Sequence, residues 1–174
     1  MKTKTERVLV IMNILVWIIF VGLCIQTGAM LTSFVVSLYS PEFAKKMYMG
    51  LNLSGLQQYD SNAYSVIAGF MIGICAVKAF IAYLTIKIFS MINLSNPFSA
   101  EVAALVERIS IVAFIAGLFA IVAASYSDWL SKNGISISYN WAAGELLLLA
   151  GVIFVIAQVF KRGIELQSEN DLTI

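Results

Sequence analysis

Two charged residues lie inside long apolar stretches of this chain. Lys78 stands in the middle of the run from about 63 to 92, and Glu145 stands near the start of the run from about 142 to 160. An amine and a carboxylate in apolar surroundings can form an ion pair or line a proton or ion path. The lysine can instead extend its stem to an interface, and the glutamate can sit at one. Lys78 and Glu145 are therefore a candidate intramembrane polar pair, and such a pair can also be purely structural.

The other residue types leave little room for catalysis. The chain has no histidine, and its two cysteines, Cys24 and Cys75, lie in apolar runs without a CxxC spacing. Histidine acid–base chemistry, Ser-His-Asp triads and His-ligated metals are therefore excluded. We expect the cysteines to be small buried hydrophobes. We predict no catalytic, cofactor-binding or metal-ligating residues, no cofactor and no enzyme activity, and a net charge of +1 argues against direct nucleic-acid binding.

The composition is that of a membrane protein. Apolar residues make up 60% of the 174 residues and charged residues 12%, against about 45–50% and about 25% in soluble domains. Four runs reach about the 20 residues that a helix needs to cross a bilayer: 8–39, 63–92, 102–130 and 142–160. Because lipid cannot satisfy backbone polar groups, such runs must be helices. The chain is predicted to be a single all-α domain, 1–174, folded as a four-helix transmembrane bundle.

The basic residues predict an orientation. With the N-terminus inside, seven Lys or Arg residues fall on the inner side and three on the outer side, which favours N- and C-termini in the cytoplasm. The outer loop is then 40–62, the inner loop 93–101 and the cytoplasmic tail 161–174. The long first helices should project outward, and the outer loop should form a small cap with a short helix in PEFAKKMYMGL. Six aromatic residues should mark the outer interface as a belt: Tyr39, Tyr64, Tyr126, Trp129, Tyr139 and Trp141.

Small residues recur every four positions on two spans. Gly69 and Gly73 lie on the second span, and Ala116, Ala120 and Ala124 lie on the third. Such stripes let helix backbones approach closely in lipid. They predict either a homo-oligomer face or a contact inside the bundle, and the second is the commoner use of the pattern.

The inner loop NLSNPFSAE has the residues of a helix start. Asn96 is a good N-cap with Pro97 in the first turn, Ser99 is an alternative cap, and Glu101 complements the helix dipole. Apolar residues follow at helical spacing on one face: Phe98, Val102, Leu105 and Ile109. The third helix is therefore expected to begin as an amphipathic turn against the inner membrane interface.

The NPFS motif, with Glu101 and Leu105 after it, and the tail phrase VFKRGIELQSENDLTI resemble a bacterial membrane family called domain of unknown function 2975. The resemblance is expected to cover the whole chain. It implies a small four-span protein of the bacterial cytoplasmic (inner) membrane without an established activity. Family genes often stand beside a small helix-turn-helix regulator of the Cro/repressor type, which implies a candidate partner. The motif positions are Asn96, Pro97, Phe98, Ser99, Glu101, Phe160, Gly163, Leu166, Asp171, Leu172 and Thr173.

These features favour a non-enzymatic interaction or regulatory protein. Its cytoplasmic loop and tail would together form one docking surface for a regulator or another cytoplasmic protein. The alternative is a small transporter or channel component that uses Lys78. Four spans without a second repeat or a broken helix lack the features typical of a transporter, unless the chain forms oligomers.

Overall fold

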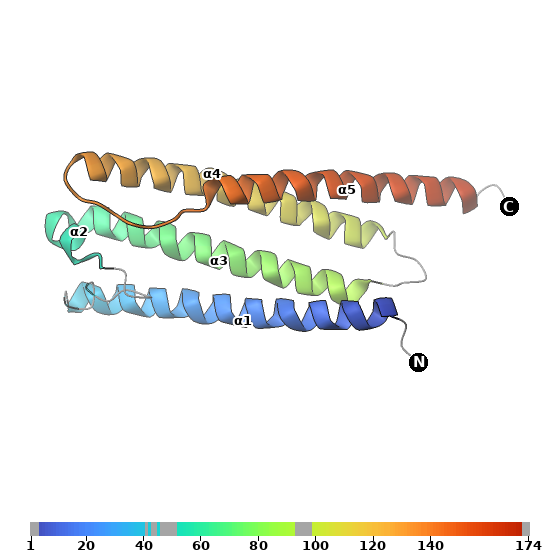
Figure 1. Ribbon diagram of the computed structural model, residues 1–174, viewed down its shortest axis with the longest axis horizontal. Helices are drawn as coiled ribbons and strands as arrows, with labels where there is room; N and C mark the ends of the chain where they lie inside the picture. Colours follow the sequence, from blue (N-terminus) through green and yellow to red (C-terminus); the bar gives the residue numbers. More distant parts are fainter. Residues whose placement is uncertain (1–3, 41, 43–44, 46–51, 93–98, 172–174) are drawn as a thin grey trace.

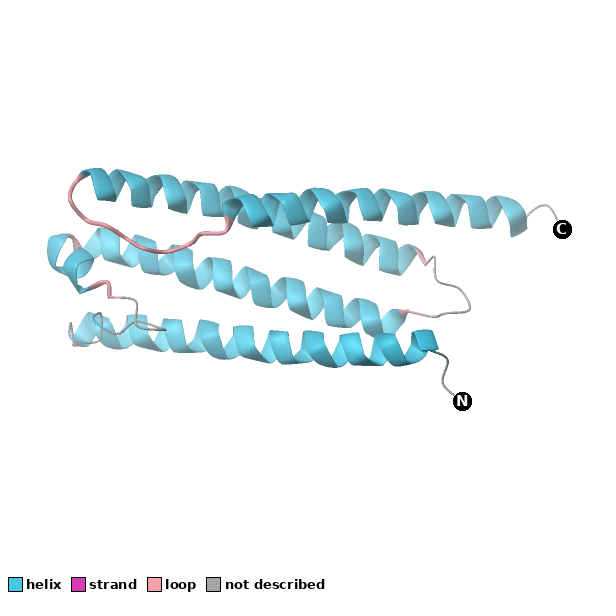
Figure 2. Ribbon diagram, viewed as in Figure 1, coloured by secondary structure: helices cyan, strands magenta, loops and turns pink. Residues whose placement is uncertain are grey.

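The computed structural model describes residues 4–40, 42, 45, 52–92 and 99–171, with the backbone alone at 170 and 171. These residues form helices and loops without a strand (Figure 2). The helices are α1 (Lys4–Tyr39), α2 (Ser54–Tyr59), α3 (Ser61–Met91), α4 (Ala100–Lys132) and α5 (Ala143–Asp171). All except the short α2 are long and apolar enough to cross a membrane. The predicted all-α fold with four candidate spans is confirmed.

The four long helices pack as successive neighbours along the chain. α1 packs against α3, α3 against α4, and α4 against α5, while α2 rests on α3. Within the described residues α1 and α5 do not contact each other, so the arrangement is open on that side. The first residues of α1 and the last of α5 lie at the same end of the molecule (Figure 1). We call this the terminal end, and we call the opposite end, with α2 and the loop 133–142, the cap end.

Many hydroxyl groups on the long helices form hydrogen bonds within their own helix. None of the helices contains a proline among the described residues. Hydroxyls within α1, α3 and α4 donate to the carbonyl one turn back, as Thr27 does to Leu23 at 2.7 Å and Thr85 to Ile81 at 2.9 Å. This local bonding lets Ser and Thr sit on a helix without an unpaired hydroxyl. The backbone and most hydroxyls therefore suit a surrounding of lipid.

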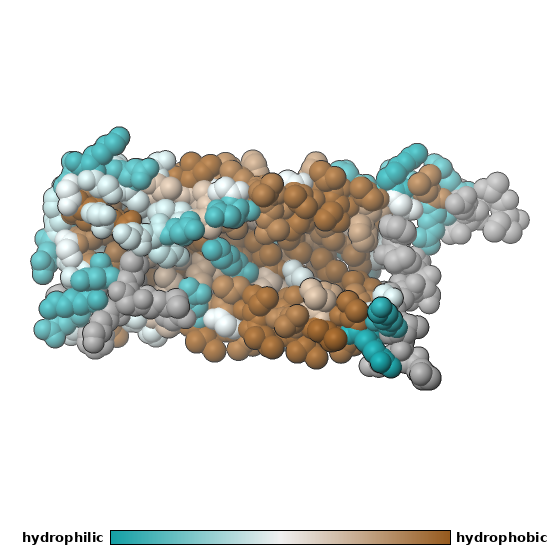
Figure 3. Space-filling view, viewed as in Figure 1, coloured by the Kyte–Doolittle hydropathy of each residue, from teal (hydrophilic) through white to brown (hydrophobic). Residues whose placement is uncertain are grey.

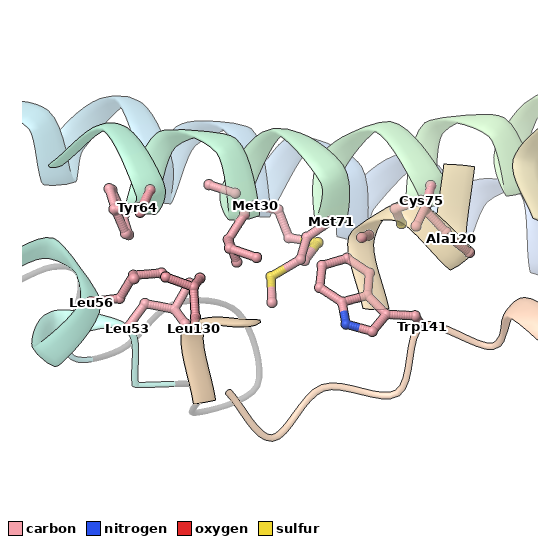
Figure 4. Close-up of a cluster of buried hydrophobic side chains, with 14 of the residues drawn as sticks. Met30, Leu53, Leu56, Tyr64, Met71, Cys75, Ala120, Leu130 and Trp141 are labelled. Carbon is pink, nitrogen blue, oxygen red and sulfur yellow. The ribbon is translucent and has the colours of Figure 1, made fainter. Parts of the chain in front are cut away.

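The largest core cluster lies toward the cap end (Figure 4). Met30 of α1 and Tyr64 and Met71 of α3 pack there with Leu130 of α4 and with Trp141. Tyr64 is fully buried, and its hydroxyl shares a hydrogen bond with that of Ser37. Tyr64 and Trp141 are thus core residues. Their predicted place in an interfacial aromatic belt is wrong, because both rings point inward at this end.

The loop 133–142, which we call the strap, explains where α5 begins. Ile135, Ile137 and Tyr139 pack on the core, and burial raises the pKa of the Tyr139 phenol. The indole nitrogen of Trp141 donates to the Ser127 hydroxyl at 3.1 Å. The strap therefore runs back along the bundle before the chain turns into its last helix (Figure 1).

A turn at the end of the strap starts α5. The backbone N–H of Ala142 donates to the Asn140 side chain at 2.9 Å, and Ala142 has a φ of 54°. Its carbonyl then accepts the first helical bond from Leu146 at 3.0 Å. Alanine rarely adopts this left-handed conformation. The side-chain bond from Asn140 helps to hold it there.

The cap end extends beyond the apolar part of the surface. α1 has 36 residues and is about 54 Å long, whereas the hydrocarbon core of a bilayer is about 30 Å thick. The apolar surface forms a band across the molecule, and polar residues gather at both ends (Figure 3). Most of the segment PEFAKKMYMGL lies outside the described residues, and the short helix seen in this loop is α2.

Candidate interaction site

The start of α4 is capped by a serine. Ser99 Oγ accepts a hydrogen bond from the backbone N–H of Val102 at 3.2 Å, and the Ser99 carbonyl accepts from Ala103 at 3.0 Å. This is the alternative cap that the sequence suggested. Asn96, Pro97 and Phe98 lie outside the described residues. Glu101 is exposed in the first turn, where its charge complements the helix dipole.

The apolar face of this first part of α4 is buried in the bundle. Val102, Leu105 and Ile109 are each less than 10% exposed. Leu105 and Ile109 pack against α3, and Val102 packs with Ala157 of α5. The prediction that these residues share one face is confirmed. The prediction of a turn lying against the membrane interface is wrong, because α3 and α5 cover that face.

An ion pair joins α4 to α5 at the terminal end. Lys161 Nζ lies 2.7 Å from Glu107 Oε1, and the two side chains are 44% and 32% exposed. A pair this exposed contributes at most about 1 kcal/mol to stability, so it adds little to the packing between α4 and α5. Sequence reasoning missed this pair. The sequence did contain a hint of the pair, because Glu107 lies off the apolar face of its helix and Lys161 follows the last apolar span.

The helix α5 continues past this ion pair. From Lys161 to Asp171 it has eleven residues and is about 15 Å long, and it reaches beyond the ends of the other three long helices (Figure 1). We call residues 161–171 the α5 extension. The predicted tail 161–174 is therefore helical over most of its length. Hydropathy marks where the chain leaves the apolar band, and a helix can continue in water beyond that point.

The family motif residues of the tail lie on or next to the α5 extension. Phe160 packs on the cluster around Val102 and Ala157, and Gly163 is half-buried. Leu166 is 47% exposed, and Arg162 pairs with Glu165 at 2.7 Å. Asp171 ends the helix, and Leu172 and Thr173 lie outside the described residues. The predicted contact between NPFS and the end of the tail thus falls outside the described part of the chain.

Lys78 and Glu145 are not paired with each other. Lys78 is half-buried on α3, and Glu145 is exposed in the first turn of α5. Among the described residues the ion pairs are Lys161–Glu107 and Arg162–Glu165. The helices α3 and α5 are separated by α4, which packs against both. The transport alternative for Lys78 remains a prediction.

The small-residue stripes have different surroundings. Ala116 and Ala120 are buried in the main core, and Ala124 packs against it, which is the contact inside the bundle that the pattern also allowed. Gly69 is exposed, and a Cβ at Gly73 would lie 3.5 Å from the Phe119 ring. A glycine outside the predicted stripes, Gly117, makes a closer contact. A Cβ there would lie 2.6 Å from Leu147 Cδ2.

Among the other reactive or charged side chains that the structure describes, Arg108 and the two cysteines do not form a common site. The Arg108 guanidinium sits 5.8 Å from the centre of the Phe80 ring. Cys75 is buried and donates weakly to the Leu23 carbonyl, at 3.9 Å from its sulfur. Cys24 is exposed on α1, so the expectation of a buried thiol is wrong for that cysteine. The described residues contain no group of three His, Cys, Asp or Glu side chains placed to hold a metal ion.

Residues 40–174 match the model of the family described as protein of unknown function (DUF2975). The chain belongs to this family. The match begins where α1 has ended, so it does not include the first span that the resemblance was expected to cover. No curated protein and no solved structure matches the chain. Membership of DUF2975 therefore does not assign an activity to the chain.

Proposed function

We propose that this DUF2975 protein is a non-enzymatic, multi-pass protein of the bacterial cytoplasmic membrane that docks a cytoplasmic partner through its terminal end. The observation that carries the proposal is the α5 extension. A helix that runs about 15 Å past its last ion pair to α4 offers a surface that the bundle itself does not need. Leu166, 47% exposed on that surface, is an apolar anchor of the kind that partners bury.

The charge distribution supports the orientation that docking requires. Lys4 and Arg7 stand at the start of α1, and Lys161 and Arg162 at the start of the α5 extension. Basic residues are enriched on the cytoplasmic side of membrane proteins. Placing the terminal end in the cytoplasm puts these four residues at the inner surface and the α5 extension in water beyond it.

The partner favoured by the family resemblance is a small helix-turn-helix regulator of the kind often encoded beside genes of this family. Docking would hold the regulator at the membrane and away from DNA. The docking element is then a helix with one exposed leucine among polar side chains, which suits an apolar groove on the partner.

The proposal predicts that Leu166→Ala weakens retention of this regulator. The regulator is co-expressed with the full chain, and the fraction that sediments with membranes is measured. Removing a central apolar anchor should reduce retention about tenfold or more. Ser168→Ala, at another exposed position of the α5 extension, is the matched control and should leave retention unchanged. Equal retention with all variants, including a chain ending at Ile164, would exclude docking through this helix.

A further inference from the structure

Two opposite charges in the apolar part of the chain have no partner among the residues that the structure describes. Lys78 on α3 and Glu145 on α5 make no ion pair or hydrogen bond in the described part of the chain. Lys78 is half-buried and Glu145 is exposed. A charge in or beside the hydrocarbon region is unfavourable unless another group neutralises it. Each of the two residues therefore calls for an opposite charge from outside the described part of its own chain.

The two charges stand at similar depths. Gly117 lies against Leu147, which places Glu145, two residues earlier on α5, close to the level of Phe119 on α4. Phe119 in turn lies against Gly73 of α3. Lys78 follows Gly73 by five residues, or about 7.5 Å along the helix. A lysine stem can extend over most of that height, so an ammonium from one chain and a carboxylate from another can meet without a vertical shift.

The packing order keeps Lys78 and Glu145 on helices that are not direct backbone neighbours. α4 lies between α3 and α5, and where side chains of α3 and α5 share a core, as Ile88 and Ile153 do, they pack around α4 residues such as Val102 and Val106. α1 packs only on α3, and none of the most apolar stretch of α1 is buried. The sides of α1 and α5 that face away from α3 and α4 are thus left to the surroundings.

We propose that two copies of this chain associate in the membrane, with Lys78 of each copy paired to Glu145 of the other. A two-fold axis along the membrane normal preserves depth, so one interface contains both reciprocal pairs. Charge complementarity favours a second copy over a lipid headgroup. A phosphate would neutralise Lys78 and leave Glu145 unpaired, whereas a second copy neutralises both. This association is independent of docking through the α5 extension.

Charge reversal tests the proposal. Copies labelled with donor or acceptor fluorophores are reconstituted in phosphatidylcholine vesicles, and energy transfer is measured as protein is diluted with lipid. Wild type should associate. K78E and E145K alone should each weaken association about tenfold or more, since like charges then face each other. The double variant K78E/E145K should associate as wild type does. Lys132→Glu, a reversal at an exposed position outside the proposed interface, is the matched control and should have no effect.

A mixture of the two single variants separates this interface from the alternatives. K78E copies carry carboxylates at both positions and E145K copies carry ammonium groups at both, so each should associate with the other and not with itself. If Lys78 paired with Glu145 of its own chain, association would recover in the double variant. In the mixture, however, K78E copies would then show no preference for E145K copies. A lipid partner would make K78E sensitive to anionic lipid and leave E145K unaffected. A monomeric wild type, or a mixture without preference, overturns the proposal even if one variant folds poorly.

Discussion

Gly117 shows how one residue sets the distance between two helices. A Cβ at this position would lie 2.6 Å and 2.8 Å from two side-chain atoms of Leu147 and 3.3 Å from its backbone nitrogen. The backbone nitrogen cannot move aside as the end of a flexible side chain can. About two turns earlier on α4, the Ser110 hydroxyl donates to the carbonyl of Ala150 at 3.0 Å. Close approach and a direct hydrogen bond between helices are the contacts that stabilise packing in lipid.

Gly117→Ala is therefore expected to destabilise the protein, although alanine favours a helix over glycine. Overpacking of this kind costs about 1–3 kcal/mol. The free energy of unfolding in mixed detergent, followed by circular dichroism, measures the effect. Gly151→Ala on α5, where a Cβ would meet nothing within 4 Å, is the control and should be neutral or stabilising. A Gly117→Ala protein as stable as this control would contradict the packing described for α4 and α5.

Sequence patterns predicted single residues well where the signal was local. Ser99 was named as the alternative cap beside Asn96, and its side chain does accept from a backbone group three residues away. Val102, Leu105 and Ile109 were identified as one helix face from their spacing, and the structure shows that this face is buried in the bundle. Gly117, Ser110 and the Glu107–Lys161 pair depend on which residues α5 brings beside α4, and no local pattern specifies that register.

At the scale of elements, the strap determines where α5 starts. The apolar spans were predictable because length and hydropathy alone set them, and their cap ends agree with the helix ends within two residues. The strap was not predicted as a packed segment, although its sequence alternates apolar with polar residues and the apolar ones are those that pack on the core. Trp141 is buried only because the strap turns back over α3 and α4. The α5 extension was likewise hidden, because hydropathy falls at Lys161 while the helix continues.

The Trp141–Ser127 hydrogen bond predicts coupling between the strap and α4. Trp141→Phe and Ser127→Ala should each destabilise the protein, and the double variant should lose less than the sum, by about 0.5–1.5 kcal/mol. Unfolding of all four proteins in the same detergent measures this coupling. Trp129→Phe, at a ring that is 54% exposed, is the control and should change stability by less than about 0.5 kcal/mol. Strictly additive losses would mean that the hydrogen bond does not hold the strap.

At the scale of the whole molecule, the two ends differ. The cap end is a packed unit of α2, the strap and the ends of α1, α3 and α4 around a shared core. The terminal end holds the start of α1, the ion pair between α4 and α5, and the α5 extension. An open row of helices joins them, with an apolar band between polar ends (Figure 3). The proposed docking therefore depends on which side of the membrane receives the terminal end.

Labelling with a membrane-impermeant maleimide tests most directly whether the terminal end faces the cytoplasm. Single cysteines are placed at Ser136, exposed in the strap, and at Ser168, exposed on the α5 extension, in a chain whose Cys24 and Cys75 have been replaced. The account predicts that the S136C variant reacts in intact cells, because the cap end faces outward. The S168C variant should react only after the cytoplasmic membrane is opened. Reaction of the S168C variant in intact cells, with protection of S136C, would place the α5 extension outside the cytoplasm and contradict the proposed function.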